Sequence, residues 1–401
     1  MIRQIDSPNA ALLGLLFALS ILITSYAAGQ DQLTRLPSPA PGNSSLSRVV
    51  ANESGEIYLS WVSQDAEQAT LAFARLTSDG WDAAQVISGG RNWFVNWADF
   101  PALSVDSSGM VAHWLQMSAT GTYDYDIRAR FYPQDKATWT EARTIHTDGI
   151  SAEHGFVSML PLNDGTTLIS WLDGRETVHS DPRGAMTLRA GIFDKSGANV
   201  SEWELDHRVC DCCQTSSAMT EKGPIIVYRD RSQQEVRDIY ATRLVDGAWT
   251  LPQAIHNDNW QIAGCPVNGP SVAAMNKRVA VAWFSAKDDV PKIQLVLSTD
   301  SGLSFSEPIV VESPNTNGRV DTTILDSGNI IVSWMDTAGE AKIMLSRYDI
   351  NGELLSTTEV AGSSASRRSG FPIIEAVRNS VYVTWTDIDA TPQVKVARID
   401  Y

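Results

Sequence analysis

Short apolar runs with a period of two recur along the whole chain. Each run alternates β-branched residues with smaller ones and closes on a large aromatic side chain, as in Ile57–Trp61 and Val279–Trp283. The other copies are Met110–Trp114, Thr167–Trp171, Ile225–Tyr228, Ile330–Trp334 and Val381–Trp385. A period of two with many Val, Ile and Thr residues is typical of strands, and no helical period appears between the copies. The pattern therefore predicts an all-β protein built from seven equivalent units.

The spacing of the closing aromatics gives the size of the unit. They lie 51 to 57 residues apart; a weaker strand precedes each aromatic run and two further strands follow it. Four antiparallel strands in about 50 residues is the unit of a β-propeller blade. Seven copies favour seven blades, and six would follow if one terminal copy packed differently. An array of sandwich domains is disfavoured because each sandwich needs about 100 residues. We expect the recurring aromatics in the core between blades.

The last unit ends after its third strand, at Tyr401. We expect the segment around Gln32–Leu36 to supply the missing fourth strand, because pairing the two ends of the chain leaves no open sheet edge. The expected organisation is thus a ring-closing segment at 29–44 and a propeller at 45–401.

The first 28 residues have the pattern of a secretory signal peptide. Arg3 precedes the apolar run Ala10–Ile23, and small residues follow, with cleavage expected after Ala27 or Ala28. An uncleaved membrane anchor is the alternative, although the run is short for a span. We therefore expect the mature chain in a periplasm or outside the cell.

The net charge of −16 and the pI of about 4.8 narrow the choice of partner. A chain this acidic repels phosphate backbones and anionic lipid, which disfavours nucleic-acid and membrane-surface binding. A small molecule, a glycan, a metal ion or another protein remains as the expected partner.

Propeller geometry places the segments between blades, and the loops after the closing aromatics, on one rim of the central channel. This rim collects aspartates and arginines that we take as candidate ligand-binding residues. They are Asp173, Arg175, Arg229, Asp230, Arg231, Arg319, Asp321 and Arg368. Singly, such residues cap turns or tie neighbouring blades together. Together, around one channel, they would hold a carboxylated or polar ligand.

Four cysteines lie in two segments of this rim. Aligning the fourth and fifth units on Tyr228 and Trp283 places Cys265 opposite Cys210. One hypothesis is a site for a soft metal ion, copper or zinc. Its ligands would come from Cys210, Cys212, Cys213, Cys265, His207 and His154, with Met159 as a further candidate. The alternatives are two structural disulfides, as an exported chain with an even cysteine count would allow, or a reactive thiol.

The segment Ser298–Phe305 carries a family resemblance. It matches the Asp-box, Ser-x-Asp-x-Gly-x-x-aromatic, in which Asp300 is expected to accept main-chain N–H groups. On this motif and the repeat, the chain resembles the sialidase-like (neuraminidase, BNR repeat) superfamily, as a member that is not itself a sialidase. The resemblance implies a β-propeller. It also implies, as an alternative function, an exo-α-sialidase type of glycoside hydrolase acting on acidic sugars.

Sialidases use an arginine triad, a tyrosine nucleophile paired with a glutamate, and an aspartate acid/base. Their Arg-Ile-Pro segment is absent here, and no residue matches a catalytic role by local motif. Three functional hypotheses result. The leading one is an exported propeller that binds a ligand, such as a soft metal ion, at the cysteine-bearing rim. The others are the glycosidase and a disulfide-stapled, protein-binding propeller.

Overall fold

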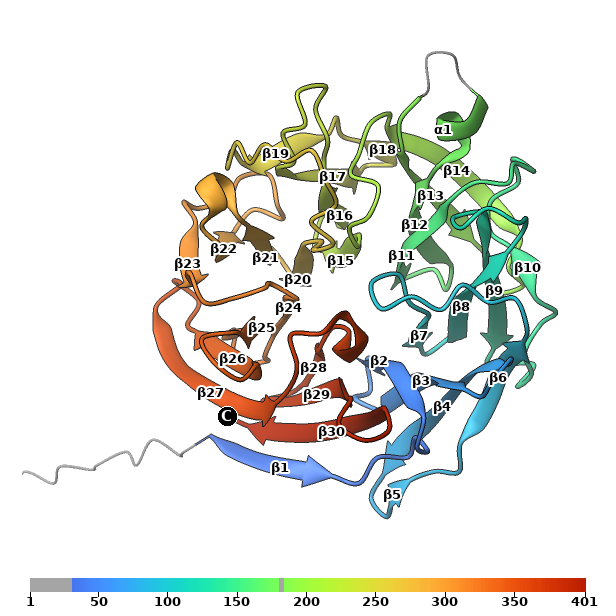
Figure 1. Cartoon of the computed structure of the whole chain (residues 1–401), viewed down its shortest axis with the longest axis horizontal. Coiled ribbons are helices and arrows are strands. Elements are labelled where there is room, and N and C mark those ends of the chain that lie inside the picture. The colour runs from blue at the N-terminus through green and yellow to red at the C-terminus, as the bar shows by residue number, and fades with distance from the viewer. Residues whose placement is uncertain (1–30, 180–183) are drawn as a thin grey trace, which may run out of the picture. The chain divides into compact units, whose positions relative to one another are not determined.

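The computed structural model describes residues 31–179 and 184–401, in which regular structure is almost entirely β-strand. Seven antiparallel sheets are arranged as blades around one axis (Figure 1). This is the seven-bladed propeller that the repeat predicts. The predicted signal peptide lies outside the described residues. Among the described residues, no helix has the length and apolar character needed to cross a membrane.

The strands follow one another blade by blade. The first three blades contain β2 (Ser44–Ala51), β3 (Ile57–Gln64), β4 (Ala69–Thr77), β5 (Gly80–Trp81) and β6 (Gln85–Gly90); β7 (Ala102–Asp106), β8 (Gly109–Met117), β9 (Tyr125–Pro133) and β10 (Arg143–Thr144); β11 (His154–Pro161), β12 (Thr167–Asp173), β13 (Thr187–Phe193) and β14 (Asn199–Asp206). The fourth and fifth contain β15 (Ser216–Thr220), β16 (Gly223–Arg229), β17 (Ile239–Val245), β18 (Ala248–Trp249) and β19 (Gln253–His256); β20 (Ser271–Met275), β21 (Arg278–Ser285), β22 (Lys292–Ser298) and β23 (Ile309–Glu312). The last two contain β24 (Asp321–Ile324), β25 (Ile330–Asp336), β26 (Lys342–Tyr348) and β27 (Leu354–Gly362); β28 (Ile373–Val377), β29 (Ser380–Asp387) and β30 (Gln393–Asp400). The short helices are α1 (Arg175–His179), η1 (Lys287–Asp289) and η2 (Arg367–Ser369).

The N-terminal strand β1 (Gln32–Leu36) closes the ring. It pairs antiparallel with β30, with Gln32 opposite Asp400 and Leu36 opposite Val396. The last blade therefore takes its outer strand from the start of the chain, as expected from its missing fourth strand (Figure 1). Pairing the two ends satisfies main-chain groups that would otherwise form an open edge.

The closing aromatics form the core between blades. Each is at most 5% exposed: Trp61, Trp114, Trp171, Tyr228, Trp283, Trp334 and Trp385. Trp283, for example, packs against Ile225 and Val227 of the preceding blade, and its indole N–H donates to Asp258 Oδ2 at 2.7 Å. Apolar burial across each blade boundary thus holds the ring together.

The Ser298–Phe305 segment forms a turn between β22 and β23. Asp300 Oδ1 accepts the main-chain N–H groups of Leu303 at 3.0 Å and Ser304 at 2.9 Å. Gly302 has a φ of 76°, a region that favours glycine. Phe305 packs into the core between the fourth and fifth blades.

Candidate functional site

The thiol cluster consists of Cys210, Cys212 and Cys213, directly before β15. Cys210 Sγ lies 3.3 Å from Cys213 Sγ and 3.8 Å from Cys212 Sγ, and all three sulfurs lie within 4.8 Å of one another. Cys210 and Cys213 are buried. A disulfide would bring two sulfurs to about 2 Å. All four cysteines, Cys265 included, are therefore free thiols in this structure.

Positive charge supports a thiolate in this cluster. Arg237 Nη1 donates to Cys210 Sγ at 3.1 Å. Burial alone would raise the pKa of Cys210, but hydrogen bonds from the two neighbouring thiols and the charge of Arg237 hold that pKa well below its usual range. Burial and the hydrogen bond to Cys210 raise the pKa of Cys213 to about 12. The cluster thus combines a thiolate with thiol donors, and the thiolate is the form that binds metals.

Cys265 approaches the thiol cluster from the next blade. Its side chain is exposed, and the hydrogen bond with Cys212 lowers the pKa of Cys265 to about 7. The two equivalent inter-blade segments therefore meet, as the alignment of the units indicated. His207 does not join them: its side chain is 87% exposed, and Asp206 lies 3.8 Å away. His154 belongs to a separate network, described below.

A tyrosine and two carboxyl groups lie beside these segments. The Tyr125 hydroxyl donates to Asp99 Oδ2 at 2.7 Å and lies 3.1 Å from Glu153 Oε1. Burial raises the pKa of Asp99 to about 7. Burial and the charge of Asp99 raise the pKa of Glu153 to about 8, and Cys265 contributes further. Both carboxyl groups are therefore acids that hold a proton near neutral pH.

The trio has the residue types that the resemblance implies for a sialidase. Its tyrosine is not placed for attack on a sugar, however. Tyr125 is 0% exposed, and its ring stacks against Phe94 with centroids 4.1 Å apart. Glu153 is half-buried and is the member of the trio that solvent reaches.

Two of the predicted ligand-binding arginines bind main chain. Arg229 is 1% exposed and donates to the carbonyl oxygens of Asn268, Arg237 and Phe284. Arg319 is 3% exposed and donates to Ser369 Oγ at 2.6 Å and to three main-chain carbonyls. Both guanidinium groups tie neighbouring blades together.

The remaining predicted residues are dispersed around the rim. Arg231 pairs with Glu235 and with Asp211, at 2.8 Å each. Asp230 is half-buried, and burial followed by the charge of Asp206 raises its pKa to about 7. Two others lie away from this group: Asp321 lines a small cavity of about 100 Å³ between the inner strands, and Arg368 is exposed on η2.

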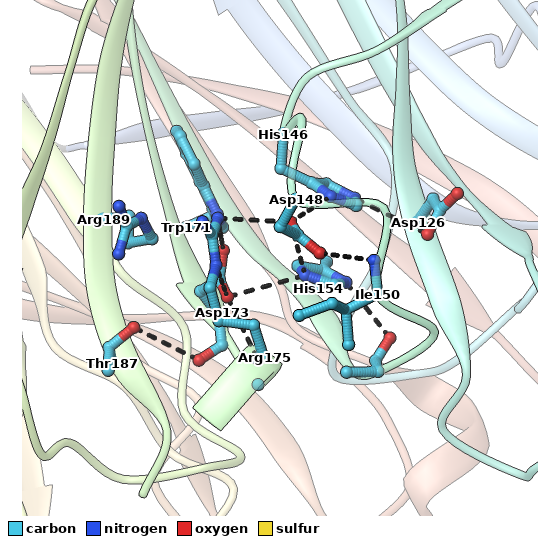
Figure 2. A network of polar contacts seen from close by, with 12 residues as sticks. Asp126, His146, Asp148, Ile150, His154, Trp171, Asp173, Arg175, Thr187 and Arg189 are labelled. Carbon is cyan, nitrogen blue, oxygen red and sulfur yellow. Dashed lines mark hydrogen bonds and ion pairs between the residues drawn. The ribbon is translucent and has the colours of Figure 1, made fainter. Parts of the chain in front are cut away.

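Asp173 and Arg175 belong to a histidine network between the second and third blades (Figure 2). Its members are Asp126, His146, Asp148, His154, Asp173 and Arg175. Asp173 accepts Arg175 Nε at 2.7 Å and Trp171 Nε1 at 2.8 Å. The His146 and His154 rings stack with centroids 3.6 Å apart.

Charge is closely balanced in this network. Burial alone would lower the pKa of His154, but hydrogen bonds to Asp148 and Asp173 raise it to about 9. Burial alone would raise the pKa of Asp173, but His154 and Arg175 hold it well below its usual range. At neutral pH two cations therefore face two carboxylates in the buried part of the network.

His146, Asp148 and Arg237 were not among the residues predicted from the sequence. His146 and Asp148 follow β10 with one residue between them, and a His-x-Asp pair beside a predicted rim was the available signal. Arg237 carries no local signal, because its contact with Cys210 depends on how the long loop between β16 and β17 folds back.

Comparison with known proteins supports the fold. No family model and no curated protein matches the chain. Among solved structures, polysaccharide lyase Uly1 aligns with a TM-score of 0.54 and 8% identity, over 86% of this chain and 88% of that one. The NanB sialidase from Streptococcus pneumoniae aligns with a TM-score of 0.49 and 8% identity, over 92% of this chain and 94% of that one. The α-L-arabinanase from Penicillium chrysogenum aligns with a TM-score of 0.46 and 12% identity, over 92% and 97% of the two chains. The alignment with Uly1 thus extends over most of both chains, although the two sequences have little in common.

Proposed function

We propose that this chain is an exported propeller that binds a soft metal ion, copper(I) or zinc, through the thiol cluster at the channel rim. The observation that carries the proposal is the convergence of three cysteine sulfurs within 4.8 Å of one another. Metal–sulfur bonds of about 2.3 Å hold pairs of sulfurs about 3.8 Å apart around a tetrahedral ion. The Cys210–Cys212 separation of 3.8 Å fits this spacing, and the Cys210–Cys213 separation of 3.3 Å needs only a small outward shift.

Two further features support a soft ion. Thiolate sulfur is the ligand that copper(I) and zinc prefer. Cys265 lies beside Cys212, so that a fourth sulfur is available from the next blade. Arg237 prepares one sulfur as a thiolate by donating to Cys210 at 3.1 Å.

Copper(I) transfer tests this function. The full chain, kept reduced, is mixed with a coloured copper(I)–chelator complex, and the loss of colour measures uptake. We expect the wild-type protein to take up copper. A variant with Cys210→Ser, Cys212→Ser and Cys213→Ser should bind copper at least about ten-fold more weakly, because the three sulfur ligands of the thiol cluster are lost. His207→Ala is the matched control, since this exposed side chain adjoins the cluster without entering it.

Counting thiols by alkylation in denaturant, without reductant, separates metal binding from the disulfide hypothesis, because Cys210 and Cys213 are buried in the folded chain. Four alkylated cysteines agree with the metal site. Four oxidised cysteines in a protein without metal would rule it out.

Carbohydrate processing at the same rim is a second candidate function. It is supported by the fold shared with a protein described as a polysaccharide lyase. Glu153 is the specific residue that favours it: a half-buried carboxyl group with a pKa of about 8 keeps its proton at neutral pH and can serve as a general acid. Acidic sugars, sialosides included, are the substrates to test first.

Activity assays test this second function. Release of a fluorogenic group from a sialoside, and cleavage of uronic-acid polysaccharides, are measured for the wild type and for Glu153→Gln. We expect activity on at least one substrate and a loss of about 100-fold in the variant, because the acid is removed. Glu307→Gln, an exposed glutamate on the fifth blade, should be unaffected. Equal rates in both variants, or no turnover of any substrate, would contradict the idea.

A further inference from the structure

One imidazole nitrogen of the histidine network has a lone pair with no donor. The His146 side chain is 3% exposed, and its Nδ1 lies 2.9 Å from Asp148 Oδ2. A carboxylate can only accept a hydrogen bond, so Nδ1 carries the proton and Nε2 presents its lone pair. Among the described residues, His146 Nε2 has no hydrogen-bond partner. A buried nitrogen lone pair without a hydrogen-bond donor lowers the stability of the fold unless another group or an ion binds it.

The group that faces this nitrogen is a second acceptor. Asp126 Oδ1 lies 3.6 Å from His146 Nε2 (Figure 2). Both residues line a hollow of about 270 Å³. An imidazole nitrogen and a carboxylate oxygen bound to one tetrahedral zinc ion lie about 3.4 Å apart. The two atoms are therefore already spaced as a pair of ligands.

We propose that His146 Nε2 and Asp126 bind one borderline divalent cation of the zinc class, with solvent in the hollow completing the coordination. Imidazole and carboxylate are the ligands that suit such ions. Asp148 acts as the outer partner that orients the imidazole, as carboxylates commonly do for metal-binding histidines. Arg175 Nη2 and the Ile150 N–H hold Asp148 in turn, at 3.2 and 2.8 Å.

His154 is not a ligand of this ion. Its Nδ1 lies 3.1 Å from the carbonyl oxygen of Ala152. Its Nε2 faces Asp148 Oδ2 at 3.3 Å and Asp173 Oδ1 at 3.5 Å. The site thus has two protein ligands and shares no ligand with the thiol cluster.

Zinc titration of the full chain tests the proposal without interference from sulfur. Calorimetry with zinc chloride is carried out on a variant in which all four cysteines are replaced by serine. We expect one equivalent to bind. In that background, Asp126→Asn and His146→Gln should each weaken binding at least about ten-fold. His256→Gln is the matched control: its Nε2 lies 3.7 Å from Asp258 Oδ1, but both Asp258 oxygens already accept from Trp283 and Gln294.

Cobalt provides a second readout on the wild-type chain, which serves if the serine variant does not fold. Thiolate-bound cobalt(II) shows an intense sulfur charge-transfer band, whereas cobalt bound to imidazole and carboxylate does not. We expect the wild-type chain to bind one equivalent of cobalt(II) that does not give this band. The His146→Gln variant should not bind that equivalent. A folded serine variant that takes up no zinc, or binding unchanged by Asp126→Asn and His146→Gln, would overturn the proposal. Failure of the thiol site alone would leave the serine-variant result intact.

Discussion

Replacing Asp173 by alanine is expected to lower the free energy of unfolding by about 3–5 kcal/mol. Asp173 is 0% exposed. Its carboxylate accepts hydrogen bonds from Trp171 Nε1, from the Arg175 side chain and from the Arg175 main-chain N–H. His154 Nε2 lies 3.5 Å from it. Its removal leaves Asp148 as the one buried carboxylate that faces both His154 and Arg175, with the partly exposed Glu202 3.7 Å from Arg175 Nη2, and breaking a buried ion pair on one side is costly. Urea denaturation followed by circular dichroism measures the loss.

Asp387→Ala is the matched control for this prediction. Asp387 also follows a closing tryptophan, Trp385, by two residues, but its side chain only caps a turn by accepting the Asp389 N–H at 3.2 Å. We expect a change within about 0.5 kcal/mol. Equal losses in both variants would show that Asp173 merely caps its turn and that the network adds nothing.

The second large effect is expected from Arg229→Ala, which should cost about 3 kcal/mol or more. The guanidinium donates to Asn268 O at 2.9 Å, Arg237 O at 2.7 Å and Phe284 O at 2.6 Å. It also stacks over Trp260 at 5.1 Å. Alanine leaves three buried carbonyl oxygens without a donor where the fourth and fifth blades meet. Thermal unfolding and urea denaturation both report the change.

Arg368→Ala separates a structural from a ligand-binding role. Arg368 was predicted for the same ligand as Arg229, but its side chain is exposed. Its loss should change stability by no more than about 0.5 kcal/mol. A stable Arg229→Ala protein with altered ligand binding would instead return Arg229 to the binding site.

Part of the candidate site could be predicted from the repeat. Aligning the units on Tyr228 and Trp283 placed Cys265 opposite Cys210, and the structure brings Cys265 beside Cys212. Equivalent segments of adjacent blades are neighbours in any propeller, so this contact follows from register alone. The same reasoning could not remove His207 from the site, because side-chain direction in a loop depends on local dihedral angles that carry no periodic signal.

The arginines of the rim differ in how deeply they are buried. Arg229 and Arg368 are the same residue type on the same predicted rim, yet one is 1% exposed and the other is on the surface. This difference in exposure arises because buried main-chain carbonyl oxygens that lack other donors lie beside Arg229 and not beside Arg368. The position of these oxygens is set by packing between blades and has no counterpart in spacing along the chain.

By itself, the sequence determined the all-β class, favoured seven blades over six and predicted the closure of the ring by Gln32–Leu36. Those features depend on the local alternation of apolar and polar residues and on a last unit that lacks a strand. Both are visible in the linear sequence. The tertiary structure alone decided which polar groups meet: Arg237 with Cys210, and His146 with Asp126 and Asp148. These contacts join loops whose paths are settled by the burial of charge and the satisfaction of hydrogen bonds in three dimensions.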